Sequence, residues 1–217
     1  MRNRFDRQLM KLNQEMIDMG AFCEEIITAA AKVVSTKDKE LIEDIKNMEE
    51  EINHKERDIE RICMKLLLQQ QPVATDLRVI SAALKMVSDM ERIGDQAADI
   101  AGIIRKESEI LVLRENTHLD KMAKETIDMV SKSVKSFVKQ DLDIAHEVIK
   151  QDDVVDDLFR QVKKEAIQLI HEEPEKGEEY VAIVLIAKYF ERIGDHAGNI
   201  AEWVEFSITG EYKGGSL

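Results

Sequence analysis

Apolar residues recur along most of the chain at the spacing of amphipathic α-helices. Between residues 74 and 106, two neighbouring lines of apolar side chains follow this spacing: Leu77, Ile80, Leu84 and Val87, and beside them Ala83, Met86, Met90, Ile93, Ala97, Ile100 and Ile104. Two adjacent lines make a broad apolar face, which is typical of a helix that packs against two neighbours. The pattern therefore predicts long helices in a bundle.

The same succession of helical patterns occurs twice. It predicts helices over residues 5–34, 39–70 and 74–106, and again over residues 119–138, 142–171 and 178–208. Gln71-Pro72 and the segment 172–177 break the pattern at matching places, because proline carries no N–H and restricts the residue before it. We expect an all-α protein of two tandem, pseudo-symmetric three-helix bundles: residues 1–107, a linker 108–118, and residues 119–217.

A turn is predicted between the first two helices. Ser35, Thr36, Lys37 and Asp38 supply hydroxyls and a carboxylate that can cap the helix that follows.

Composition agrees with few, long elements. The 217 residues include two prolines, nine glycines and 5% aromatics, whereas a β-sandwich or barrel needs many more turn residues. The net charge of −13 argues against binding to nucleic acid or anionic lipid and favours a cation as the small partner. Cys23 and Cys63 are expected to be buried thiols.

The sequence contains no targeting or membrane signal that we can identify. The N-terminal residues lack the apolar core of a signal peptide, and no apolar run approaches the roughly eighteen residues of a membrane span. We therefore expect a cytoplasmic protein.

One acidic motif is repeated one hundred residues apart. ERIGDQAADIA begins at Glu91 and ERIGDHAGNIA at Glu191, and eight of the eleven positions are identical. At helical spacing, the repeated acidic and polar positions form one stripe beside the apolar face: Glu91, Asp95 and Asp99, and then Glu191, Asp195 and Asn199.

Carboxylates at the edge of a core repel one another and are costly to desolvate, so a cation must neutralise them. Arg92 or Arg192, a basic residue of another helix, or a metal ion could do so. Oxygen ligands suit Mg²⁺ and Mn²⁺, and clustered carboxylates also suit iron.

The preceding helix of each half offers further ligands. Asp152 and Asp156 lie four residues apart, and the corresponding positions of the first half hold Glu49 and Asn53. The mid-helix glycine of each motif indicates a close approach of a neighbouring helix or a ligand, or simply tight packing. His196 has no counterpart in the first half, and we interpret it as a residue behind the ligands or on the surface rather than as a ligand.

Enzymatic motifs are not found in the sequence. It contains no GxSxG, no P-loop and no glycine-rich nucleotide fingerprint. We expect that the protein is not an enzyme.

The duplicated ERIGD and the QQPVATDLR of residues 70–78 resemble the PhoU family of phosphate-transport accessory proteins over essentially the whole chain. The resemblance implies a six-helix, two-repeat cytoplasmic protein, usually a dimer. It also implies a role in phosphate homeostasis: restraint of phosphate uptake and of the phosphate-starvation response, through contact with the ATPase subunit of the phosphate ABC transporter and with a sensor histidine kinase.

The resemblance further implies metal ions, whether iron, zinc, manganese or magnesium. The family's motif falls on Glu91 and Asp95 and on Glu191 and Asp195. The partner motif falls on Asp152 and Asp156, and in the first half on Glu49 with Asn53 in place of the second acid, which would weaken that site. Asp76 and Arg78, in the stretch that has no equivalent after Pro174, are expected to brace their helix or to meet a partner.

Two other functions remain open at this point. One is a metal-binding helical bundle with an enzymatic or storage role. The other is a helical adaptor whose acidic stripes are satisfied by lysine or arginine.

Overall fold

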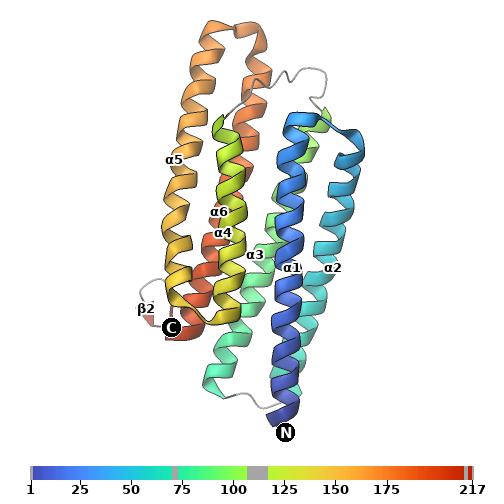
Figure 1. The fold of residues 1–217 in the computed structure, drawn as a ribbon, viewed down its shortest axis with the longest axis vertical. Coiled ribbons are helices and arrows are strands. Elements are labelled where there is room, and N and C mark those ends of the chain that lie inside the picture. The colour runs from blue at the N-terminus through green and yellow to red at the C-terminus, as the bar shows by residue number, and fades with distance from the viewer. Residues whose placement is uncertain (1, 70–72, 107–116, 213–214, 217) are drawn as a thin grey trace.

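Over the described residues, the chain folds into six long helices that pack side by side (Figure 1). The structure, a computed structural model, describes residues 2–69, 73–106, 117–212 and 215–216. The main elements are α1 (Arg2–Thr36), α2 (Lys39–Gln69), α3 (Ala74–Lys106), α4 (Thr117–Lys139), α5 (Leu142–Glu172) and α6 (Gly177–Thr209), with a short 3₁₀ helix, η1 (Pro174–Lys176), between the last two. The predicted all-α fold is confirmed, and the predicted helix ends differ from these by three residues or fewer.

Parts of two predicted breaks lie outside the described residues: Gln71-Pro72 and most of the linker 108–118. The break at residues 172–177 is seen as the end of α5 followed by η1, where Pro174 opens the 3₁₀ turn.

The turn between α1 and α2 is partly as expected. The Oδ1 atom of Asp38 accepts hydrogen bonds from the backbone N–H groups of Glu40 and Leu41, at 2.9 and 3.4 Å, and so caps α2. The hydroxyls of Ser35 and Thr36 bond instead to the carbonyl of Lys32 in the last turn of α1, so they do not cap the next helix.

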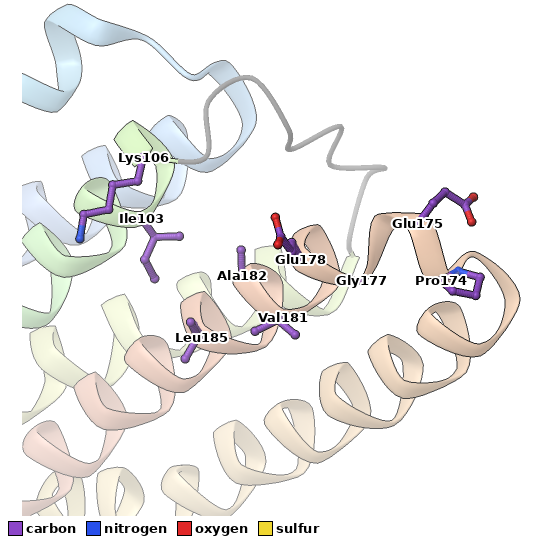
Figure 2. Close-up of a pocket in the computed structure, with 9 residues that line it drawn as sticks. All are labelled: Ile103, Lys106, Pro174, Glu175, Gly177, Glu178, Val181, Ala182 and Leu185. Carbon is purple, nitrogen blue, oxygen red and sulfur yellow. The ribbon is translucent and has the colours of Figure 1, made fainter.

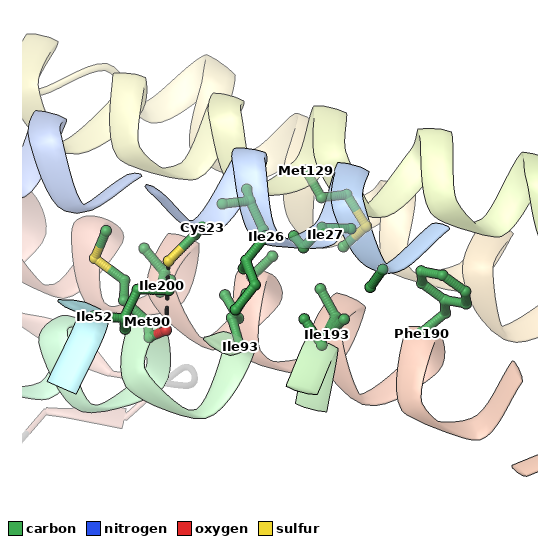
Figure 3. Close-up of a cluster of buried hydrophobic side chains, with 14 of the residues drawn as sticks. Cys23, Ile26, Ile27, Ile52, Met90, Ile93, Met129, Phe190, Ile193 and Ile200 are labelled. Carbon is green, nitrogen blue, oxygen red and sulfur yellow. Dashed lines mark hydrogen bonds between the residues drawn. The ribbon is translucent and has the colours of Figure 1, made fainter. Parts of the chain in front are cut away.

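The halves share one apolar core. Within the described residues, α3 and α6 form the most extensive helix pair, α1 packs against α4, and buried side chains of all six helices belong to a single cluster. Figure 3 shows its centre, where the thiol of Cys23 on α1 donates to the carbonyl of Met90 on α3 at 3.4 Å. Burial raises the pKa of both cysteine thiols, that of Cys63 to about 12, so both stay protonated in the interior.

The C-terminal residues fold back on the end of α6. Two short strands, β1 (Glu211–Tyr212) and β2 (Gly215–Ser216), pair antiparallel, and the ring of Tyr212 stacks on Trp203 with 4.2 Å between centroids. The sequence pattern did not indicate these strands. None of the helices in the described ranges has the length and hydropathy needed to cross a bilayer.

Candidate metal centre

Four carboxylates of the second half meet between α5 and α6. Asp152 and Asp156 lie one turn apart on α5, and Glu191 and Asp195 lie one turn apart on α6. Asp156, Glu191 and Asp195 each place a carboxylate oxygen within 4.8 Å of the others. These three are the only acidic, histidine or cysteine side chains of the described residues that form such a group. Their oxygen atoms are close enough to share one ion.

Asp152 lies behind this group of three. An ideal Cβ on Gly194 would lie 3.3 Å from its Oδ1 atom and 3.3 Å from the Cγ1 atom of Val155. The glycine of the second motif therefore allows α5 and α6 to approach closely where the carboxylates gather, as the sequence predicts.

Among the carboxylates of the second half, Asp152 has the most strongly raised pKa. Burial, and then the negative charges of Asp195, Asp156, Asp153 and Glu191, raise the pKa of Asp152 to about 6. Burial and the charge of Asp156 also raise the pKa of Asp195, against the opposing effect of Lys188. A group of acids that hold protons more tightly than usual is a site where a cation would stabilise the fold.

One lysine partly supplies that cation. The ammonium of Lys188 donates to both carboxylate oxygens of Glu191, one turn further along α6. The same nitrogen lies 5.4 Å from the ring centroid of Phe159 on α5. The sequence interpretation considered a basic residue from another helix but missed this one, which is three residues before the motif on the same helix.

The acidic cluster of the first half has a different composition. Burial, then Asp95, Glu56 and more weakly Glu49, raise the pKa of Glu91. Burial and Asp99 raise the pKa of Asp95.

Asn53 takes the place of an acid, but the first half still has four acids. Glu56, one turn further along α2, joins Glu49, Glu91 and Asp95. The amide of Asn53 donates to the Oε1 atom of Glu49 at 2.9 Å. Burial, the charge of Glu60 and, more weakly, the charge of Asp95 raise the pKa of Glu56. Glu56 was missed by the sequence interpretation, although it follows Glu49 and Asn53 at the i, i+4, i+7 spacing of a single helix face.

The first-half acids border an open groove of about 320 Å³. Its lining includes Glu56 and Glu91 together with Glu50, Asn53, His54 and Arg57. Gly94 again permits the close approach of the helices, since a Cβ there would lie 3.0 Å from the Cδ1 atom of Ile52. Tight packing thus accounts for this glycine, and the acids stay accessible to solvent on one side.

Asp99 and Asn199 face a different contact. Burial, the charge of Asp99 and a hydrogen bond to Asp99 raise the pKa of Tyr189 on α6. The amide of Asn199 donates to the Oδ1 atom of Asp89 on α3 at 3.4 Å. Both residues were expected among the ligands. The structure places Asn199 at the contact between α3 and α6, outside the group of three carboxylates, and Asp99 beside both this contact and Asp95 of the first half.

His196 also belongs to this contact. Its Nδ1 atom lies 2.9 Å from the Oδ1 atom of Asp89, and both side chains are buried. Of the two alternatives for His196, the surface position is excluded, while a position behind the ligands stays a prediction. Arg92 and Arg192 are exposed, as their place on the helix indicates.

A larger groove lies away from the acids. It has a volume of about 970 Å³ and lies between the end of α3 and the start of α6, as Figure 2 shows. Its apolar lining is formed by Ile103, Val181, Ala182 and Leu185, with Glu175, Glu178 and Lys106 around them. None of the predicted site residues lines this groove.

Sequence comparison identifies the repeat. The model of the PhoU domain matches the chain twice, over residues 16–104 and 119–204. The chain belongs to the PhoU family. Each matched range contains one copy of the repeated motif.

The chain is similar to curated PhoU relatives over most of its length. It is 32% identical to a phosphate-specific transport system accessory protein PhoU homolog of Clostridium acetobutylicum, over 95% of each chain. It is 34% identical to the one of Aquifex aeolicus, over 86% of this chain and 84% of the relative.

Solved structures carry the same fold. PhoU from Pseudomonas aeruginosa superposes with a TM-score of 0.90 at 29% identity, over 95% of this chain and 100% of that one. The phosphate transport system regulatory protein PhoU from Streptococcus pneumoniae gives a TM-score of 0.88, also at 29% identity, over 96% and 98% of the two chains.

Proposed function

We propose that this protein is an accessory regulator of phosphate transport. The observation that carries the proposal is the agreement along nearly the whole chain, in sequence and in fold, with proteins named as accessory or regulatory proteins of the phosphate-specific transport system. Agreement over both repeats supports transfer of a role that depends on the whole molecule.

The finer role follows the family resemblance. In this proposal the protein restrains phosphate uptake and the phosphate-starvation response by contacting the ATPase subunit of the phosphate ABC transporter and a sensor histidine kinase. It works in the cytoplasm as a non-enzymatic homodimer and reaches the membrane only through its partners. The net charge of −13 supports protein partners over nucleic acid, because the phosphate backbone repels an acidic surface.

The acidic clusters are the proposed metal sites. The fit rests on the donor set: Asp156, Glu191 and Asp195 offer three carboxylate oxygens within 4.8 Å of one another, with Asp152 behind them. The oxygen ligands suit a hard ion such as Mg²⁺ or Mn²⁺, and clustered carboxylates also admit iron. Zinc is less well matched, because its closed sites usually include sulfur or nitrogen ligands.

In the first half, the residues that would hold the ion are Glu91 and Asp95 with Glu49 and Glu56. The bound cation would remove the repulsion that raises the pKa values of these acids and would hold α2 against α3. A stable surface for protein partners is the function that such an ion would serve.

A metal-free adaptor remains the second candidate, and Lys188 favours it in the second half. Its ammonium already meets Glu191 there, as a purely structural counter-ion would. Metal analysis of the purified protein separates the two candidates, because the adaptor would hold no metal and would not change on chelation.

The regulatory proposal is tested in a deletion strain grown in high phosphate, with alkaline phosphatase activity as the readout of the starvation response. We expect high activity in the deletion strain and low activity after complementation with the wild-type gene. Activity that stays low without the protein would overturn the proposal. Complementation with the double variant Asp95→Ala, Asp195→Ala then shows whether the acidic clusters contribute to repression.

A further inference from the structure

The two acidic clusters also differ at two pairs of equivalent positions. Lys188 in the second half corresponds to Ser88 in the first, each three residues before the glutamate of its motif. On the preceding helix, Phe159 corresponds to Glu56, because each lies seven residues after the equivalent acid, Asp152 or Glu49. The exchanges occur together: Lys188 lies over the ring of Phe159, whereas Ser88 lies beside Glu56.

Lys188 is held in place by two contacts. It donates to both oxygen atoms of Glu191, whose side chain is 12% exposed, while the lysine side chain itself is 46% exposed. The ring of Phe159 supports the ammonium from the α5 side at 5.4 Å. The lysine therefore reaches from solvent to the carboxylate that a metal ion would need.

In the first half of the described chain, no basic side chain is held against an acid in this way, although the charges of Arg92 and Arg57 act on Glu91, Asp95 and Glu56 without an ion pair. Among the described residues, no ion pair joins a lysine or arginine to Glu49, Glu56, Glu91 or Asp95. Its four acids therefore keep a formal charge of −4. The four acids of the second half carry the same charge, which Lys188 reduces to −3.

We infer that Lys188 is a tethered counter-ion that competes with an external cation for Glu191, so that the two pseudo-symmetric clusters are not equivalent. The first cluster has only the longer-range charges of Arg92 and Arg57 and depends on an external ion for direct neutralisation. The second is partly neutralised by its own chain and binds that ion more weakly than its carboxylates alone would. This inference rests on the proposed metal binding.

Titration of the metal-free protein with Mn²⁺ tests the inference, with calorimetry and electron paramagnetic resonance of the bound ion as readouts. The variant Asp95→Asn is used as background to disable the first cluster. In that background we expect Lys188→Gln to tighten Mn²⁺ binding by about tenfold or more, because a unit charge a few ångströms away is removed.

Two further variants control for net charge and for folding. Lys163 also lies over the Phe159 ring, at 5.9 Å, without an ion pair to Glu191, so Lys163→Gln makes the same charge change and should alter affinity by less than about threefold. The mirror variant Ser88→Lys, made with Asp195→Asn as background, should weaken binding to the first cluster. It tests the same idea if Lys188→Gln fails to fold, as judged by circular dichroism.

The outcomes are distinct. Tighter binding in Lys188→Gln and weaker binding in Ser88→Lys would support the inference. Mn²⁺ binding that Lys188→Gln leaves unchanged, or changes only as much as Lys163→Gln does, would overturn it while leaving metal binding intact. If neither cluster of the wild-type protein binds Mn²⁺, both the metal proposal and the competition fail, and the regulatory proposal stands on its own test.

Discussion

At the scale of single residues, burial and repulsion in the acidic cluster of the second half act most strongly on Asp152. Its carboxylate is half-buried between α5 and α6 and is repelled by four other acids, while the ammonium of Lys188 is bound to Glu191. Burial and repulsion act in the same direction, so this side chain favours its protonated form more than a free aspartate does.

Stability without metal should therefore fall as the pH rises. The pKa of Asp152 is raised from the ordinary 3.8 to about 6 in the folded protein, so between these values the folded state binds more protons than the unfolded state. Its stabilising contribution is complete below pH 3.8 and is lost as the pH rises through about 6. We expect Asp152→Asn to stabilise the chelator-treated protein at pH 7 by about 1 kcal/mol, a value reduced for solvent screening, and to do so much less at pH 4.

Urea unfolding of the two proteins at both pH values measures this difference. Glu147→Gln is the control, since Glu147 is exposed on the same helix and its charge is not among those that raise the pKa of Asp152. A gain from Asp152→Asn that is equal at pH 4 and pH 7, or matched by the control, would contradict the assignment of strain to Asp152.

The sequence predicts part of the site and misses the rest for a physical reason. Glu91 and Asp95 could be found because one turn of a helix brings residues four apart together. Glu56 and Lys188 were missed because their roles depend on which side chain the neighbouring helix places opposite them. Asp99 continues the same stripe, yet its contact is with Tyr189, because α6 crosses α3 there. Periodicity places a residue on a face and does not reveal what packs against that face.

At the scale of elements, the helix pattern was sufficient to predict all six helices, because few residues in this chain interrupt a helix. The turns needed more information. Lys37 and Gln140, which precede the capping residues Asp38 and Asp141, both have positive φ values, 54° and 52°. The repeat thus extends to its turns, although neither turn uses the glycine that would normally mark this conformation.

The turn between α1 and α2 can be tested in both directions. Lys37→Gly should stabilise the protein by about 0.5–1 kcal/mol, because a side chain is strained at positive φ. Asp38→Ala should destabilise it by about 1 kcal/mol, since the N–H groups of Glu40 and Leu41 lose their acceptor. Thermal unfolding followed by circular dichroism gives both values, and changes of the same sign would show that the turn is not held as described.

The close contact of α1 with α4 at Gly20 can be tested by comparing two glycine substitutions, one at this contact and one in open space. A Cβ on Gly20 would lie 2.9 Å from the Cγ2 atom of Val134, a buried β-branched residue that cannot easily move aside. Gly20→Ala should therefore cost about 1–3 kcal/mol. Gly102 in α3 has nothing within 4 Å of the same position, so Gly102→Ala should instead stabilise by up to about 1 kcal/mol.

Denaturant midpoints of the two alanine variants provide the comparison. The variants share the same change in helix propensity, so their difference isolates the packing at the α1–α4 crossing. Equal effects would mean that the two helices separate without cost, and the close approach at Gly20 would not contribute to the fold.

At the scale of the whole molecule, the two repeats are joined by more than the linker. Asp89 on α3 contacts His196 and Asn199 on α6, and Tyr189 on α6 bonds to Asp99 on α3. Each half therefore presents polar groups whose partners belong to the other half. Together with the continuous apolar core, these contacts predict that the halves unfold as one unit.

The variant Asp89→Ala tests this coupling, because it leaves the buried His196 and the amide of Asn199 without their shared acceptor. We expect a loss of about 1–3 kcal/mol in the free energy of unfolding. Adding His196→Gln places the residue found at the equivalent position 96 of the first half and removes the unpaired ring, so the double variant should lose less than the sum of the two single changes. If the polar contacts align halves that are already joined by the core, the urea midpoint shifts and the slope of the transition stays constant. A lower slope or a second transition in Asp89→Ala would show instead that the polar contacts make the repeats cooperative, and a partner that binds across α3 and α6 could then change how firmly the two halves are joined.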